Sequence, residues 1–111
     1  MNRVLLIDED VTHAEELARR LAERSLTVIH AADSGAAIAQ LRNREYLCDL
    51  VILCIAHRSR PWLEVLRDLQ HASRQAGFRE VPLFLCVSRL QLGIDFQLQV
   101  ERMGARYASE E

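Results

Sequence analysis

An acidic triplet, Asp8, Glu9 and Asp10, directly follows the apolar run at residues 4–7. Carboxylate oxygens are ligands that Mg²⁺ prefers, and such sites form at the carboxyl ends of strands in open α/β sheets. The sequence therefore indicates an acidic pocket at Asp8 and Glu9, which is a weak candidate for a metal site. The plainer interpretation is an acidic turn in which Asp10 favours the start of the following helix.

Thiol chemistry is the second candidate, because the chain has three cysteines, Cys48, Cys54 and Cys86. Cys54 and Cys86 lie near the ends of two apolar runs that we expect to form neighbouring strands, so a thiol-based sensor centred on this pair is one hypothesis. The opposing physics is that nearby carboxylates disfavour a thiolate. Buried cysteine is also common in protein cores, so packing is the favoured role for all three.

The charged residues exclude several classes of function. All 14 basic residues are Arg, so Schiff-base catalysis and a Walker-type phosphate lysine are absent. A net charge of −2 gives no electrostatic reason to expect nucleic-acid binding, and the four histidines show no metal-ligand spacing among themselves. No apolar run approaches the roughly 18–20 residues of a membrane span. Acidic residues follow Arg3 too early for a signal peptide, so we expect a cytoplasmic protein.

Short apolar runs alternate with amphipathic stretches along the chain. Residues 4–7, 27–30, 49–55 and 81–87 are predicted strands, most of them apolar on both faces, as in a parallel sheet. A capping box from Thr12 to Glu15 predicts a helix start, as do Ser34 and Pro61 for the next two helices. This βαβ pattern predicts a single α/β domain over residues 1–111, with helices on both faces of a parallel sheet.

The last quarter of the sequence is ambiguous. From Leu92 to Val100 apolar and polar residues alternate strictly, which taken alone predicts a strand. As a helix, the stretch 92–103 places Phe96 and Val100 on one stripe and Ile94 with Leu98 on another. The βαβ alternation favours the helix, whose second apolar face would be a contact surface. Residues 104–108 are a candidate fifth strand, and we expect the chain to lack a fifth helix.

These segments together resemble a response-regulator receiver domain of the CheY-like type. The residues that carry the resemblance are the acidic pair after the first strand, the turn and glycine at 32–38, and the strands at 49–53, 81–85 and 104–107. The resemblance implies a flavodoxin-like, doubly wound sheet of five parallel strands in the order 2-1-3-4-5. It also implies two-component signalling, in which a histidine kinase passes a phosphoryl group to an aspartate after the third strand. Magnesium on the acidic pair assists that transfer.

Several positions depart from the family pattern. Matched onto this sequence, the phosphoacceptor position falls on Cys54, and the Ser/Thr position falls on Val87, with Ser88 one residue late. The position of the family's lysine falls on Glu110 or Glu111, and a carboxylate there would repel a phosphate. With the third carboxylate missing, we expect no cofactor, and no tightly held Mg²⁺.

The sequence therefore predicts a degenerate receiver that is not an enzyme and acts by protein–protein interaction. The expected partner is another protein, such as a histidine kinase or a fused output domain, or a second copy of the chain. Its contact surface would lie between Leu92 and Tyr107, with Ile94, Phe96, Leu98 and Tyr107 as the candidate interface residues. Two alternatives remain: the thiol sensor, and phosphorylation of a non-standard carboxylate such as Asp8.

Overall fold

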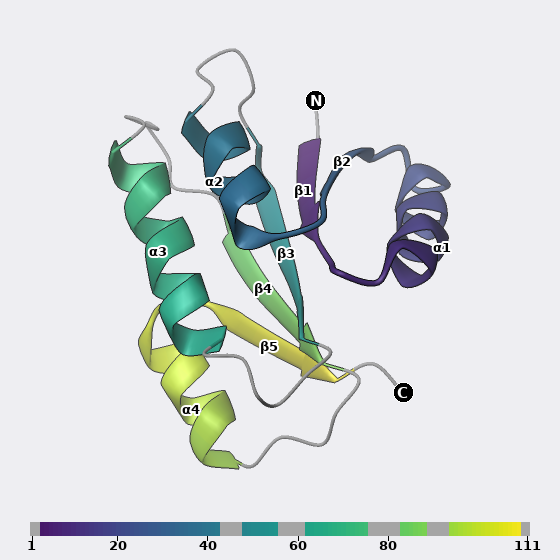
Figure 1. The fold of residues 1–111 in the computed structure, drawn as a ribbon. Helices are drawn as coiled ribbons and strands as arrows, with labels where there is room; N and C mark the ends of the chain where they lie inside the picture. Colours follow the sequence, from purple (N-terminus) through teal and green to yellow (C-terminus); the bar gives the residue numbers. More distant parts are fainter. Residues whose placement is uncertain (1–2, 43–47, 56–61, 76–82, 89–93, 110–111) are drawn as a thin grey trace.

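The computed structural model describes residues 3–42, 48–55, 62–75, 83–88 and 94–109. Five parallel strands form one sheet in the order β2-β1-β3-β4-β5, which confirms the predicted doubly wound α/β fold (Figure 1). The elements in chain order are β1 Arg3–Ile7, α1 Val11–Ala22, β2 Thr27–Ala31, α2 Ser34–Arg42, β3 Leu50–Ile55, α3 Trp62–Gln75, β4 Leu83–Ser88, α4 Ile94–Arg102 and β5 Arg106–Ser109.

The sheet separates two apolar cores, because successive side chains of a strand point to opposite faces. In β1, Leu5 and Ile7 face the larger core, whereas Val4 and Leu6 face the smaller one. All four are nearly inaccessible to solvent, which explains why the sequence shows a continuous apolar run here and no alternation.

The larger core lies between the sheet and three helices, α2, α3 and α4, which Figure 1 shows together on one side. Helix α3 contributes most of the helical side chains: Leu66 and Leu69 are 1% and 0% exposed, and Trp62 is 7% exposed. Each fully buried leucine contributes on the order of 2 kcal/mol of apolar transfer free energy. This side of the sheet therefore holds most of the packing of the fold.

Helix α1 lies on the opposite face and begins differently from the prediction. The predicted capping box placed the N-cap at Thr12, but the helix starts at Val11 and its N-cap is Asp10. An Asp10 side-chain oxygen, Oδ1, accepts a hydrogen bond from the backbone N–H of His13 at 3.1 Å. The cap falls two residues earlier because the aspartate already satisfies an N–H group that the first turn leaves without a partner.

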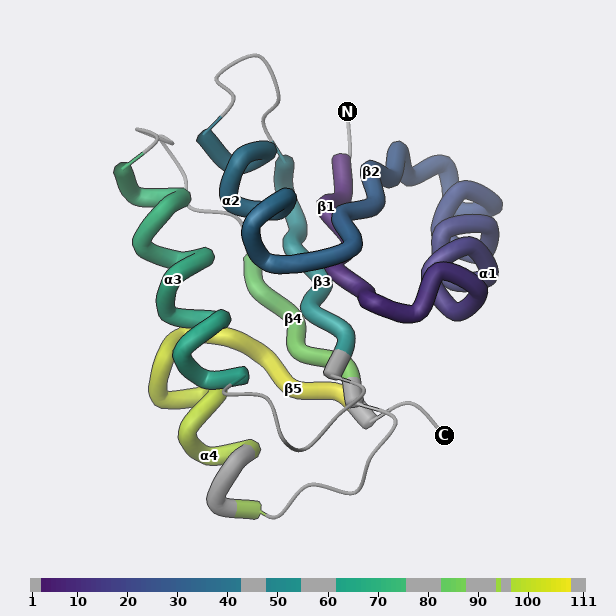
Figure 2. Tube along the Cα trace, viewed as in Figure 1, coloured from purple at the N-terminus to yellow at the C-terminus, as the bar shows by residue number. Residues whose placement is uncertain are grey.

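The ambiguous stretch forms a helix, α4, rather than a strand. Val100 is fully buried in the larger core and Met103 packs against it, whereas Ile94 and Leu98 are exposed. The helix ends at Arg102, and Gly104 shortly after it has a φ of +81°, the left-handed conformation that glycine adopts readily. The trace in Figure 2 then passes directly into β5, which pairs with β4.

Of the described helices, only α1 lies on the smaller core's face, where it contacts β1 and β2. Farther along the sheet, three apolar residues of β4 point to this face: Leu83 is 48% exposed, and Leu85 and Val87 are partly buried. We call Leu83, Leu85 and Val87 the open strip. No helix among the described residues is long and apolar enough to cross a bilayer.

Candidate functional site

The candidate site lies where β1 and β3 end, at the carboxyl edge of the sheet. The two strands are parallel neighbours, with Ile7 opposite Leu53. The residues that come next, Asp8 after β1 and Cys54 in β3, therefore lie side by side. Both side chains are buried, Asp8 at 1% and Cys54 at 5% exposure. The structure thus brings together the predicted acidic position and the predicted phosphoacceptor position.

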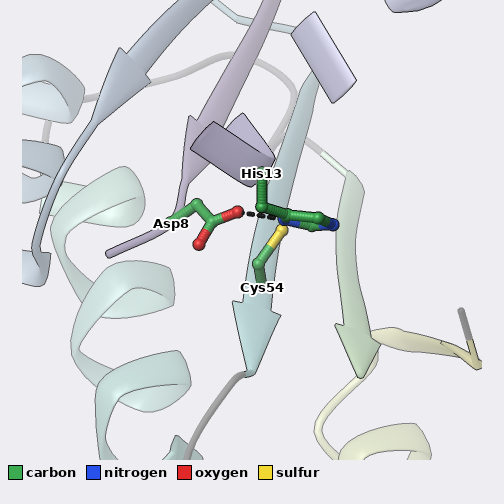
Figure 3. A group of neighbouring side chains, drawn as sticks. All are labelled: Asp8, His13 and Cys54. Atoms are coloured by element: carbon green, nitrogen blue, oxygen red, sulfur yellow. Dashed lines mark hydrogen bonds and ion pairs between the residues drawn. The ribbon is translucent and has the colours of Figure 1, made fainter. Parts of the chain in front are cut away.

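A third side chain, His13, joins them from the first turn of α1. Its imidazole Nδ1 is hydrogen-bonded to Oδ2 of Asp8, and Figure 3 shows the carboxylate, the ring and the Cys54 sulfur converging. His13 is 9% exposed, so the contact is shielded from water. A carboxylate that accepts from an imidazole in such a setting fixes the orientation of the ring and its tautomer.

The Asp8 carboxylate is held at its other oxygen as well. The backbone N–H of Asp10 donates to Oδ1 at 2.9 Å, and Nε2 of His30 bonds the backbone carbonyl oxygen of Asp8 at 2.8 Å. Asp10 therefore makes two hydrogen bonds in this turn: its backbone N–H donates to Asp8, and its side chain accepts from the backbone N–H of His13. These bonds fix the β1–α1 turn and with it the position of the imidazole.

Donor atoms of Asp8, His13 and Cys54, one from each, lie within 4.8 Å of one another. The predicted metal site was the acidic pair Asp8 and Glu9, but Glu9 is half-buried and is not part of this group. Sequence reasoning missed His13, because it looked for metal-ligand spacing among the histidines only. The signal was present: Asp8 and His13 are five residues apart across a strand-to-helix turn that Asp10 closes.

A small pocket opens beside the cluster. Its volume is about 10 Å³, on the order of what one water molecule requires. Glu9 and the only tryptophan of the chain, Trp62, help to line it together with Asp8 and Cys54. The pocket has room for a water molecule or an ion.

The other family positions lie along the neighbouring strand. Val87 is the direct β-ladder partner of Cys54 and packs in the smaller core, so an apolar side chain stands at the Ser/Thr position. Ser88 pairs with Ile55, which fixes its backbone one step farther along. The side chain of Ser88 and the whole of Glu110 lie outside the described residues.

The two cysteines of the proposed thiol pair lie on opposite faces of the sheet. Cys86 is the ladder partner of Leu53 and belongs to the larger core, whereas Cys54 belongs to the smaller one. Burial raises the pKa of the Cys86 thiol to about 12 and that of Cys48 to about 11, so neither ionises near neutral pH. Cys54 and Cys86 therefore do not face each other as a sensing pair would, and Cys48 and Cys86 are core residues.

The structure divides the predicted interface residues. Ile94 is 71% and Leu98 is 43% exposed on α4, as expected for a contact surface. Tyr107 is only partly exposed and packs against the larger core, so it is a supporting residue rather than a free surface group. Phe96 belongs to the same helix, but its side chain is outside the described residues.

Comparison with known proteins identifies the fold. No family model matches the chain, and no curated protein matches it. Among solved structures, a response regulator from Burkholderia pseudomallei with a phosphorylated aspartic acid is similar with a TM-score of 0.80 and 18% identity, over 99% of this chain and 60% of that one. A chemotaxis protein of the CheY type from Vibrio cholerae gives 0.75 and 16%, over 99% and 87%.

An adenylate cyclase from Rhodopirellula baltica is also similar, with a TM-score of 0.76 and 16% identity over 99% of this chain and 77% of that one. This chain spans less than two thirds of the Burkholderia protein. At such identities the likeness establishes architecture, and the strand order agrees with it. The chain therefore has the five-stranded fold of a response-regulator receiver domain, with a thiol, an imidazole and a carboxylate at its carboxyl edge.

Proposed function

We propose that this chain is a receiver-type module of two-component signalling that acts by binding a protein and does not accept a phosphoryl group. The observation that carries the proposal is Cys54, a buried thiol in line with the strand end where the family has its phosphoacceptor. Mg²⁺ prefers oxygen ligands, and sulfur is a poor ligand for it. With Cys54 at this position, the site lacks the third carboxylate that would hold the Mg²⁺ that assists phosphoryl transfer.

Two further features support the loss of phosphoryl transfer. The chain has no lysine, so no ammonium group is available to hold the oxygens of a phosphoryl product. The carboxylate of Asp8 is occupied, since Oδ1 accepts from the Asp10 N–H and Oδ2 bonds His13. An attack by Asp8 on phosphorus would break a hydrogen bond inside a buried site, which disfavours it as a substitute acceptor.

The proposed binding surface is the exposed side of α4, represented by Ile94 and Leu98. Val100 anchors the opposite side of the same helix in the larger core, so the exposed leucine and isoleucine are presented on a fixed support. Exposed apolar groups on a packed helix are typical of contact surfaces. The proposed partner is a second copy of the chain or a signalling protein, in the cytoplasm.

The test of the phosphorylation part is incubation with acetyl phosphate and Mg²⁺, followed by intact-mass measurement. We expect no gain in mass for the natural chain. A stable gain of one phosphoryl group would contradict the proposal, and peptide mapping to Asp8 would then establish phosphorylation of a non-standard carboxylate.

The matched variant is Cys54→Asp, which returns a third carboxylate beside Asp8 and Glu9. We expect it to bind Mg²⁺ more tightly than the natural chain, by about tenfold or more, because a hard oxygen replaces sulfur. Equal Mg²⁺ affinity in the two chains would show that Cys54 does not disable the site.

A further inference from the structure

We infer that Asp8, His13 and Cys54 form a binding site for a thiophilic transition-metal ion of the Zn²⁺ class, in place of a magnesium site. The three donors come from three separate elements: the turn after β1, the first turn of α1 and the end of β3. Their ligand atoms lie within 4.8 Å of one another, and all three side chains are buried.

The donor set selects the ion. One sulfur, one imidazole nitrogen and one carboxylate oxygen suit Zn²⁺, whereas Mg²⁺ and Ca²⁺ require oxygen. Zinc bonds of roughly 2.0–2.3 Å place the ligands of a tetrahedron about 3.5 Å apart. The observed spread of up to 4.8 Å therefore closes by about an ångström when the ion enters and the His13–Asp8 hydrogen bond opens.

The surroundings provide what a metal site needs beyond its ligands. The Asp10 N–H holds the second oxygen of Asp8, and the Asp10 side chain holds the backbone of His13. Such supporting bonds orient metal ligands and raise their affinity. Asp8 and Cys54 also line the adjoining pocket together with Glu9, so a fourth ligand, water or the Glu9 carboxylate, would come from that side.

The proton balance of binding is simple. The Cys54 thiol releases one proton to solvent as it becomes a thiolate. The proton of a neutral His13 ring moves from Nδ1 to Nε2, which frees Nδ1 to bind the metal. Affinity is therefore expected to weaken as the pH falls, because protons compete for the same ligands.

Cysteine hydrolases use the same three residue types, and the geometry here does not suit that chemistry. Cys54 is 5% and His13 9% exposed, so little of the thiol or the imidazole is presented to a substrate. The metal site does not depend on the proposed signalling function. A phosphorylated Asp8 would contradict that function, whereas loss of Cys54-dependent metal binding would contradict only this inference.

The experiment is titration of the reduced, metal-free chain with Co²⁺ as a spectroscopic probe, followed by competition with Zn²⁺. We expect a thiolate-to-cobalt charge-transfer band with the visible intensity of a tetrahedral site at one ion per chain, abolished by Zn²⁺ and unaffected by excess Mg²⁺. Binding without a charge-transfer band, or no binding, would overturn the inference without the need for any variant.

Variants assign the ligands. Cys54→Ser and His13→Gln should each lower Zn²⁺ affinity by about 100-fold or more, because each removes a direct ligand. The matched controls are Cys86→Ser, a buried thiol on the other face, and His71→Gln, an exposed imidazole on α3; both should keep natural affinity. Circular dichroism confirms that each variant is folded. Equal affinity of folded Cys54→Ser and the natural chain would refute the assignment.

Discussion

Asp8, Glu9 and Asp10 are chemically alike, yet each lies in a different environment. Asp8 is 1% exposed and bonded to an imidazole, Glu9 lines a pocket, and Asp10 is an exposed helix cap. The alternation of side chains explains the split: Asp8 continues the inward direction of Leu6, and the chain then turns into α1. At the scale of residues, position relative to the strand end decides which carboxylate can do chemistry.

The neighbourhood of Asp8 and Cys54 could be predicted from the sequence, because parallel strands bring their carboxyl ends to one edge of the sheet. The approach of His13 could not. It depends on where α1 begins, and the capping box at Thr12 gave a start that was too late. Two competing caps within three residues differ by only about 1 kcal/mol, too little for a sequence pattern to resolve.

A residue-scale prediction concerns the pH dependence of folding stability. The Cys86 pKa, raised by burial from 9.0 to about 12, means that the folded chain keeps a proton that the unfolded chain loses. Above pH 9 the unfolded state therefore binds fewer protons, so the free energy of unfolding falls as the pH rises toward 12. Urea unfolding across this range should show the decline, and Cys86→Ala should show a shallower one.

The control uses the same thiol at neutral pH. In the folded chain Cys86 should resist alkylation, because the thiolate is the reactive form and burial suppresses it. Rapid labelling of Cys86 in the native chain, or identical pH profiles for Cys86→Ala and the natural chain, would count against the argument.

At the scale of elements, α4 shows how tertiary context decides between two periodicities. Its alternating residues satisfy a strand pattern and a helix pattern equally, and the sheet already has a partner for β4 in β5. As a helix, the segment buries Val100 and leaves Ile94 and Leu98 outside. The extra apolar side, which made the sequence ambiguous, is the side that we propose as a binding surface.

The prediction for α4 is that Leu98→Asp removes association while the fold stays intact. Leu98 is 43% exposed, so the free energy of unfolding should change by less than about 0.5 kcal/mol. Sedimentation of the natural chain over a range of concentrations should show a dimer that the variant lacks. Gln99→Asp places the same charge on an adjacent exposed residue and should keep the dimer.

A natural chain that stays monomeric at high concentration would refute self-association through α4. A dimer that persists in the Leu98→Asp variant would show that the interface lies in another part of the molecule.

At the scale of the whole molecule, the two faces of the sheet are covered unequally. Helices α2, α3 and α4 cover one face, whereas among the described helices only α1 lies on the other, next to β1 and β2 (Figure 1). The open strip on β4 results from this imbalance. An exposed apolar group such as Leu83 attracts other apolar surfaces, which makes the strip a second candidate place for association.

The prediction for the open strip uses two neighbouring residues of β4. The chain should bind an environment-sensitive hydrophobic dye, and Leu83→Asp should lower that binding at little cost to stability, because Leu83 is already 48% exposed. Phe84→Asp, at a site only 3% exposed on the other face, should cost roughly 3 kcal/mol or more. Dye fluorescence and urea unfolding measure the two effects, and unchanged dye binding in Leu83→Asp would contradict the assignment.

The fold was predictable because most segments of the sequence agree on it. The strands β1, β3 and β4 are short apolar runs, and α1 and α3 each have an apolar stripe, such as Leu66 and Leu69 of α3, so small errors at the ends of elements do not change the topology. The site depends on single contacts, such as that between His13 and Asp8. A shift of one residue at the start of α1 would rotate the imidazole about 100° around the helix axis and remove the contact.

Trp62 gives the molecule a built-in optical reporter. It is the only indole in the chain, and it lines the pocket next to Asp8 and Cys54. Tryptophan fluorescence therefore comes from a single place, so a change in emission wavelength or intensity on adding an ion reports events in that pocket without any attached label. A paramagnetic or heavy ion there would quench the fluorescence of Trp62, and the quenching would disappear when a chelator removes the ion.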